Sequence, residues 1–350
     1  MKTELPANPG FDPYGESSRI NGDAYPRSAP PDDSRLDRRR RTLLDILAAR
    51  LSFRADDDTR NLLRAWTVIV VLGVIDRFWA DRAGLTFVGW RAIAPGLGFI
   101  GSVAVFYDIS GRNRRLAGAS HYVALWVGLS IAGCILTYLM ATLRLPLRDA
   151  DLARIDAALG FDWFAWSRFV GAHPLLRLPL AIAYASFLPQ IIGSVMWFSH
   201  IGRDDRNREL LWAGMLSLLI TAVVSGLLPA LGPFFPGHAP DWSLALLAIR
   251  DGTASKFALG DLKGIITMPS FHTVMAILLI YSHRPPVRSF SLIAILNVMM
   301  LLGTPAAGHH YLIDMIAGAA VAALSIAIVR NQVNGSLTDC PSVESRKFRP

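Results

Sequence analysis

Long apolar runs alternate with short polar segments along most of the chain after residue 60. A helix needs about 20 mostly apolar residues to cross the hydrocarbon core of a bilayer, with roughly 17 to 25 as the working range. The pattern predicts eight such crossings, at residues 62–80, 92–108, 120–143, 175–199, 209–231, 266–283, 289–305 and 309–329. The chain is therefore expected to form an all-α, polytopic membrane helix bundle.

The remaining segments divide the chain into four parts. Residues 1–60 are rich in Pro and charge and poor in aliphatic residues, so we expect a disordered, basic cytoplasmic segment. Residues 61–118 are expected to form two accessory transmembrane helices, residues 119–331 a six-helix core, and residues 332–350 a disordered tail.

Two further segments favour helices that lie on a membrane surface. The stretch TLLDILAARLSFR, residues 42–54, is amphipathic and is expected on the inner surface. Residues 150–172 carry Trp163, Trp166 and Phe169, which are typical of an interfacial helix on the outer surface.

The distribution of Lys and Arg predicts the orientation of the bundle. The net charge is +8, and most basic residues flank the crossings that would share one side of the membrane. Cytoplasmic loops are enriched in Lys and Arg, so both termini are expected in the cytoplasm. With 52% hydrophobic residues, the basic charge fits anionic lipid headgroups better than nucleic acid. The two cysteines, Cys134 and Cys340, suggest neither a disulfide nor a metal site.

Two stretches carry candidate chemistry. His272 stands at the head of an apolar run in TMPSFHTVMAILLIYS, residues 267–282, and His309 and His310 lie in GTPAAGHHYLIDMIAGAA, residues 303–320. Two crossings separate these stretches, so the histidines are expected at the same membrane depth, at the outer face.

Spacing distinguishes the two adjacent histidines. On a helix that starts near Gly308, His310 lies four residues before Asp314, whereas His309 lies four before Ile313. Asp314 can therefore accept the Nδ1–H of His310 and leave Nε2 free. An ionisable residue near the bilayer is functional by default, whereas His121, His200 and His283 fit ordinary interfacial or structural positions.

This set of residues favours phosphoryl transfer. His310 would attack phosphorus and form a phosphohistidine, while His272 would protonate the departing alkoxide. Ser270, Arg250 and Lys263 are candidates for binding the phosphate, although each of the two cations could equally face lipid headgroups. No cluster of carboxylates suggests Mg²⁺, so metal-independent chemistry without a cofactor is expected.

The motifs PSFH and HHYLIDMIAG resemble those of the type-2 phosphatidic acid phosphatase superfamily, in its bacterial branch similar to inositol phosphorylceramide synthase. The resemblance covers roughly residues 120–330. It implies a six-helix core and a phosphatase or phosphotransferase that acts on lipid phosphates outside the bacterial inner membrane. It places the leaving-group acid at His272, the nucleophile at His310 and the orienting acid at Asp314.

The chain departs from the superfamily pattern in three places. Phe271 stands where the second motif usually has Gly, and Gly303 and Thr304 replace a Ser-Arg pair in the third. The Lys…Arg-Pro first motif is absent. The stretches LPLRDADLARIDAALGFDW and YASFLPQ look similar to the same branch but suggest no chemistry. Tyr184 and Gln190 in the latter are either pocket residues or structural polar residues.

Three functions compete on this evidence. The first is a lipid phosphatase, or a transferase that uses an alcohol such as inositol as the acceptor. The second is a transporter with a His/Asp proton relay, against which no inverted repeat is apparent. The third is an inactive membrane scaffold, which would predict a degraded site, whereas His272, His310 and Asp314 are all present.

Overall fold

The computed structural model describes residues 57–338. The expectations for residues 1–56, including the amphipathic helix at 42–54, and for residues 339–350 fall outside the described part of the chain. Helix α13 continues to Thr338, past residue 331, where the core was expected to end.

Helices dominate the described residues, so the all-α prediction is confirmed. In chain order they are α2 (Asp57–Ala83), α3 (Trp90–Ser110), α4 (Arg114–Ala141), α5 (Asp149–Ala158), α6 (Trp163–Ala172), α7 (Pro174–Ala185), α8 (Phe187–His200), α9 (Asp204–Leu227), α10 (Asp241–Asp251), α11 (Phe271–Ser282), α12 (Phe290–Gly308) and α13 (Leu312–Thr338). Two short strands that were not predicted, β1 (Thr86–Val88) and β2 (Lys256–Ala258), pair in parallel, and a 3₁₀ turn, η1 (Leu259–Asp261), follows β2.

The protein is an integral membrane protein. Five described helices, namely α3, α4, α9, α12 and α13, are long and apolar enough to cross a membrane, and the bent pair α7–α8 makes a sixth if it is one span. The predicted crossing at 62–80 corresponds to α2, which carries Arg64, Asp76 and Arg77 in its apolar stretch and is not among these membrane-spanning candidates.

The predicted crossing at 266–283 is shorter than expected. Its helix, α11, begins only at Phe271, because Pro269 precedes it and the Ser270 side chain caps its first turn. Twelve residues span about 18 Å, less than the roughly 30 Å of the hydrocarbon core. Ser270, at the N-terminus of α11, is fully buried.

The predicted crossing at 175–199 is bent by 56° between α7 and α8. Ser186 occupies the break, and its hydroxyl donates to the Ala183 carbonyl and accepts from Nε2 of Gln190. The Gln190 Oε1 in turn accepts a 2.7 Å hydrogen bond from Asn297 in α12. Gln190 and Asn297 are buried, so Gln190 has a structural role: it links the bend to the neighbouring helix.

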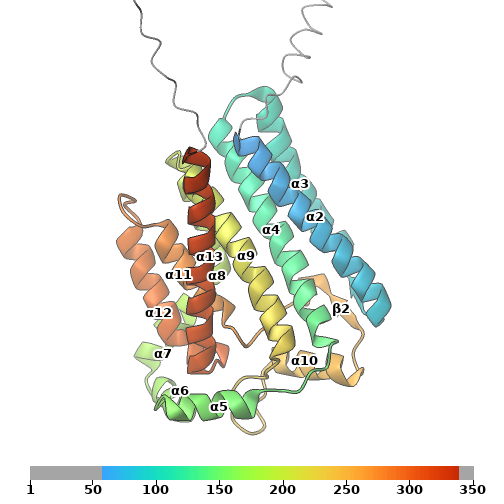
Figure 1. Cartoon of the computed structure of the whole chain (residues 1–350), viewed down its shortest axis with the longest axis vertical. Helices are drawn as coiled ribbons and strands as arrows, with labels where there is room; N and C mark the ends of the chain where they lie inside the picture. The colour runs from blue at the N-terminus through green and yellow to red at the C-terminus, as the bar shows by residue number, and fades with distance from the viewer. Residues whose placement is uncertain (1–56, 339–350) are drawn as a thin grey trace, which may run out of the picture. The chain divides into compact units, whose positions relative to one another are not determined.

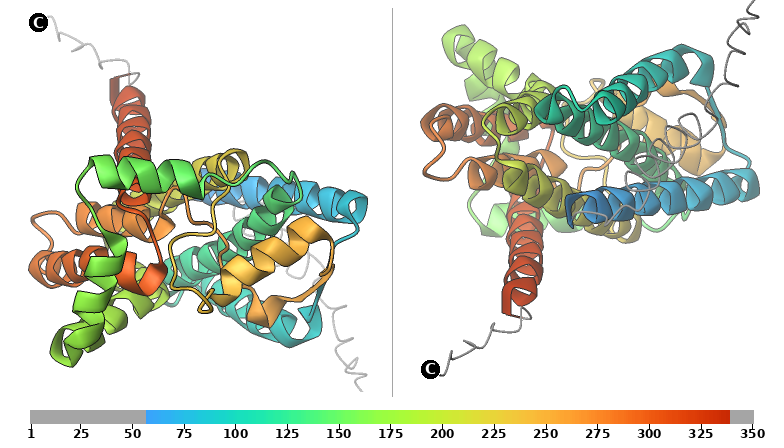
Figure 2. Two further views of the ribbon diagram at one scale, coloured as in Figure 1. Left: turned by 90° about the horizontal axis from the view of Figure 1, so that it is seen from below. Right: turned by 90° about the horizontal axis from the view of Figure 1, so that it is seen from above.

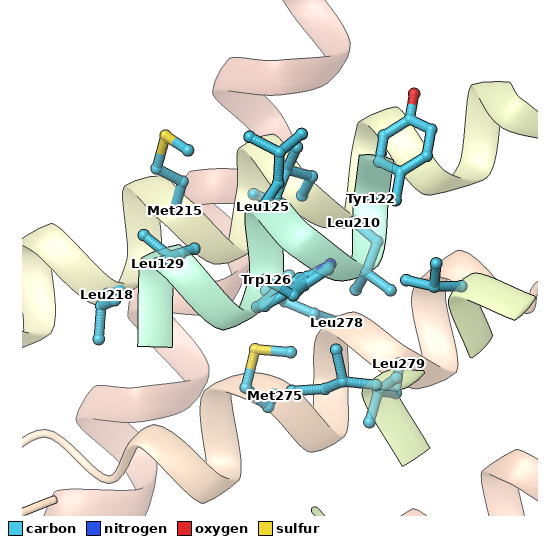
Figure 3. Packing of buried hydrophobic residues seen from close by; sticks show 14 of the residues in the cluster. Tyr122, Leu125, Trp126, Leu129, Leu210, Met215, Leu218, Met275, Leu278 and Leu279 are labelled. Atoms are coloured by element: carbon cyan, nitrogen blue, oxygen red, sulfur yellow. The ribbon is translucent and has the colours of Figure 1, made fainter. Parts of the chain in front are cut away.

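The largest apolar core lies between α4, α8, α9, α11 and α13 (Figure 3). Trp126 of α4 packs there among Leu210, Leu278 and Met275. Its ring lies directly against Gly214 of α9, where an added Cβ would come within 2.4 Å of the indole. The glycine therefore lets α4 and α9 approach closely around this core.

Three short helices, α5, α6 and α10, lie across one end of the bundle (Figures 1 and 2). The expected interfacial helix at 150–172 is in fact two helices, α5 and α6, which are separated by a turn containing Gly160 at φ 76°. Helix α2 begins and α13 ends at the opposite end (Figure 1). The end that carries α5 and α6 is where the two histidine motifs meet.

Candidate active site

A backbone hydrogen bond joins the two histidine motifs. The N–H of Ser270 donates to the carbonyl of Asp314 over 2.9 Å, and the Ser270 hydroxyl caps α11 by accepting from the N–H of Thr273. Gly318 of α13 lies so close that an added Cβ would come within 2.5 Å of the Ser270 carbonyl oxygen. The start of α11 is therefore packed against the first turns of α13.

The turn between α12 and α13 separates His309 from His310. His309 ends α12 in the left-handed region, at φ 53°, which is uncommon for a residue other than glycine. Its Nδ1–H donates to the Pro233 carbonyl, and its ring lies between Trp163 and Trp242, with centroids 5.7 and 5.3 Å away. Burial lowers the pKa of His309.

His310 instead faces Asp314, as the four-residue spacing predicted. Its Nδ1 lies 3.5 Å from Oδ2 of Asp314, and both side chains are buried. The two atoms are close enough for an ion pair when the imidazole is protonated, but they form no hydrogen bond, and Nδ1 has no other hydrogen-bond partner among residues 57–338. Catalytic hydrogen bonds are often long in unliganded structures and tighten when substrate binds.

Asp314 has a second partner in the same turn. Its Oδ2 accepts a 2.9 Å hydrogen bond from the backbone N–H of Tyr311. Tyr311 precedes the first residue of α13, so this contact is the return half of a capping box, in which the third helical residue binds the capping residue's N–H. Asp314 is thus held in place by the first turn of its own helix.

The imidazole of His272 lies between two aromatic rings from either side of the α7–α8 bend. Tyr184 stacks on it, with ring centroids 3.9 Å apart and planes inclined by 15°, and Phe187 lies 4.8 Å away. A Cβ added at Gly308 would lie 2.7 Å from the Tyr184 hydroxyl and 2.8 Å from Cδ2 of His310. Tyr184 therefore contacts His272 with its ring face and extends toward His310 with its hydroxyl edge.

The candidate phosphate-binding residues are placed differently. Ser270 is buried between the two motifs. Arg250 lies in the last turn of α10, and its Nη1 is buried without a hydrogen-bond partner among the described residues. Lys263 forms a 2.7 Å ion pair with exposed Asp241, and this pairing lowers the pKa of Asp241. No hydrogen bond or ion pair described for either cation reaches the histidines, and their binding of phosphate stays a prediction.

Two carboxylates of α5 also reach the site, and sequence reasoning assigned them no role. Asp156 accepts hydrogen bonds from the N–H groups of Leu312 and Ile313, over 2.7 and 2.9 Å. Asp149 accepts from those of Leu231 and Gly232. Burial raises the pKa of Asp156, although its two backbone hydrogen bonds oppose the shift.

A cavity of about 950 Å³ opens beside this end of the bundle. Its walls come from α5, from α6, from Tyr311 and from the loop that begins at Leu231. The lining residues include Asp149, Asp156 and Trp163. Among the described residues, no group of three or more His, Cys, Asp and Glu side chains could hold a metal ion. The groups at hand for chemistry are two imidazoles, one of them backed by a carboxylate.

A family model described as the PAP2 superfamily matches residues 150–328, just over half of the chain. No curated protein and no solved structure matches the chain. The matched range begins in α5, ends in α13 and includes both histidine motifs. The protein therefore belongs to the PAP2 superfamily, whose members are phosphatases that act on phosphate esters.

Proposed function

We propose that this protein is a metal-independent lipid phosphatase or phosphotransferase that works through a phosphohistidine on His310. The observation that carries the proposal is the pairing of His310 with buried Asp314, 3.5 Å apart, next to the motif that bears His272. A buried carboxylate behind an imidazole orients the ring and stabilises the positive charge that develops on it.

The first chemical step forms the phosphoenzyme. The Nε2 lone pair of His310 attacks phosphorus, the bond from phosphorus to the lipid oxygen breaks, and His272 gives its proton to the departing oxygen. Asp314 faces Nδ1, so Nε2 is the nitrogen left for the attack.

The second step releases the phosphoryl group. His272, now neutral, takes a proton from an incoming water or alcohol, whose oxygen attacks phosphorus as the bond to His310 breaks. Water gives a phosphatase, and a sugar alcohol such as inositol gives a transferase of the kind implied by the resemblance to inositol phosphorylceramide synthase. Backbone N–H groups at the start of α11, with Ser270 and Arg250, are the proposed partners of the phosphate oxygens.

The location of the site supports an extracytoplasmic reaction. The motifs meet at the end of the bundle opposite to where α2 begins and α13 ends (Figure 1). The Lys and Arg distribution predicts that both termini lie on the cytoplasmic side of a bacterial inner membrane, and the site then faces outward.

The decisive experiment uses the full chain in detergent micelles with phosphatidic acid as the probe and EDTA present. We expect phosphate release and, after rapid quenching in base, a phosphoenzyme that acid destroys. His310→Ala abolishes both, whereas His309→Asn, which tolerates the left-handed conformation, retains them. A requirement for added Mg²⁺, or an active His310→Ala protein, would contradict the mechanism.

The acceptor is tested separately. A panel of phospholipids is incubated with and without free inositol, and the phosphorylated products are separated. An inositol-dependent inositol phosphate product supports the transferase, and phosphate release that inositol does not change supports the phosphatase.

A further inference from the structure

Helix α5 presents two carboxylates on one face. Asp149 and Asp156 are seven residues apart, which is about two helical turns. Asp156 is only 3% exposed, although α5 lies at the end of the bundle and not in its core. A carboxylate in such a place is expensive to bury unless it binds donors.

Asp156 caps a helix in another part of the chain. Helix α13 begins at Leu312, so Tyr311 stands at the capping position, where Ser, Thr, Asp or Asn is usual. The Tyr311 ring cannot accept the free N–H groups of the first turn. Asp156 accepts two of them instead, through Oδ2 from Leu312 and through Oδ1 from Ile313.

This division of donors affects Asp314. Three backbone N–H groups that have no partner within the helix lie close to the Asp314 carboxylate. They belong to Tyr311, Leu312 and Ile313. Because Asp156 takes two of the donors, Asp314 binds only that of Tyr311 and keeps its side chain beside His310. Without Asp156, Asp314 is the carboxylate left near the two released N–H groups, and they would draw it away from the imidazole.

Asp149 supports the other side of the same turn. It holds Leu231 and Gly232, and the Tyr311 hydroxyl donates to it over 3.4 Å. A Cβ added at Gly232 would lie 2.3 Å from the His309 carbonyl oxygen, so this loop packs directly on the histidine pair. Helix α5 thus touches the turn through both buried Asp156 and half-buried Asp149.

We propose that Asp156 is a positioning residue for the reaction, which acts through the first turn of α13 on the Asp314–His310 pair. This inference rests on the proposed function, because it assigns Asp156 a part in forming the phosphohistidine. The residue touches neither phosphate nor the reacting nitrogen.

The test compares Asp156→Ala and Asp156→Asn with a control on the same helix. Asp151→Ala removes an exposed carboxylate of α5 that pairs with Arg148 and Arg154. We expect Asp156→Ala to lower the rate of phosphohistidine formation by about tenfold or more, with KM within about threefold of wild type. The rate of Asp156→Asn should lie between those of Asp156→Ala and wild type, because its amide oxygen can accept one of the two hydrogen bonds. The rate of Asp151→Ala should stay near that of wild type.

A double mutant separates positioning from a general loss of structure. If Asp156 acts through Asp314, then Asp156→Ala has little further effect on the rate in an Asp314→Asn background. The proposal would be overturned if Asp156→Ala lowered the rate by the same factor in the wild-type and Asp314→Asn backgrounds. It would also be overturned if Asp156→Ala and Asp156→Asn each kept the wild-type rate per folded molecule. Should wild type itself form no phosphohistidine, the proposed function fails, irrespective of Asp156.

Discussion

The ring of Tyr184 lies stacked on the imidazole of His272, with the centroids 3.9 Å apart. Tyr184 lies in the last turn of α7, just before the 56° bend, and Phe187 on the other side of the bend contacts the same imidazole. The bend thus gives His272 two aromatic neighbours from one short segment. In a straight helix across 174–200, these two residues, three positions apart, would be separated by about 300° around the axis and would lie on the same side of the helix.

The stack gives a test of how His272 is held. Tyr184→Phe keeps the ring, whereas Tyr184→Leu removes an aromatic contact of about 0.5–1.5 kcal/mol. We expect Tyr184→Leu to lower kcat by up to about tenfold with alkyl leaving groups, which need a proton, and less with nitrophenyl phosphate. Comparison of the two substrates measures this difference. An equal loss with both would show that the ring does not act through His272.

The charge of Asp314 can be removed while its capping contact stays. Asp314→Asn retains an oxygen that can accept the Tyr311 N–H, so the turn should persist. In hydrolytic triads the same change costs about 10⁴ in kcat, because the imidazole adopts the wrong tautomer. We expect a loss of about 10²–10⁴ in phosphohistidine formation, measured by single-turnover quenching, with thermal unfolding near that of wild type. Activity within a few-fold of wild type would exclude an orienting role.

The contact between α11 and α13 leaves no space for a methyl group at Gly318. The nearest atom is the Ser270 carbonyl oxygen, at 2.5 Å from an added Cβ, and backbone cannot move aside as a side chain can. Gly318→Ala should therefore destabilise the protein by about 1–3 kcal/mol and lower its activity. Gly193→Ala in α8 meets nothing within 4 Å and serves as the matched control. Thermal unfolding in detergent measures both, and equal effects would contradict the close approach.

The two candidate phosphate-binding cations are expected to differ. Arg250 has a buried Nη1 that finds no hydrogen-bond partner in the described part of the chain, whereas Lys263 is already paired with Asp241. Arg250→Ala should lower kcat/KM for phosphatidic acid by about tenfold or more, and Lys263→Ala by less than about threefold. Because Lys263 lowers the pKa of Asp241, this pair persists at neutral pH and is lost only as the pH falls through that lowered pKa. Equal losses would point to a shared electrostatic effect.

Much of the site was predictable because its signals are local. The four-residue spacing of His310 and Asp314 depends only on local sequence, and the structure places the two side chains beside each other as expected. The apolar runs predicted the helix bundle, although the run at 266–283 forms a shorter helix than expected and the run at 175–199 is bent. The superfamily could likewise be predicted from two short motifs.

The features that sequence reasoning missed depend on distant partners. Asp156 binds N–H groups 156 and 157 positions away. Almost every residue has a backbone N–H, so the sequence does not indicate which of these groups Asp156 binds. The only available signal was a pair of aspartates seven residues apart on one helix. The bend at Ser186 was also missed, since hydrophobicity alone does not distinguish one straight span from two inclined helices.

Only residues 309–311 connect α12 to α13, and one of them adopts a left-handed conformation. An epitope or fluorophore inserted there would shift every residue of α13 relative to the helix before it, so such a label would report on a damaged enzyme. The exposed prolines at 285 and 286, in the loop between α11 and α12, offer a place for a reporter that leaves the register between α12 and α13 intact.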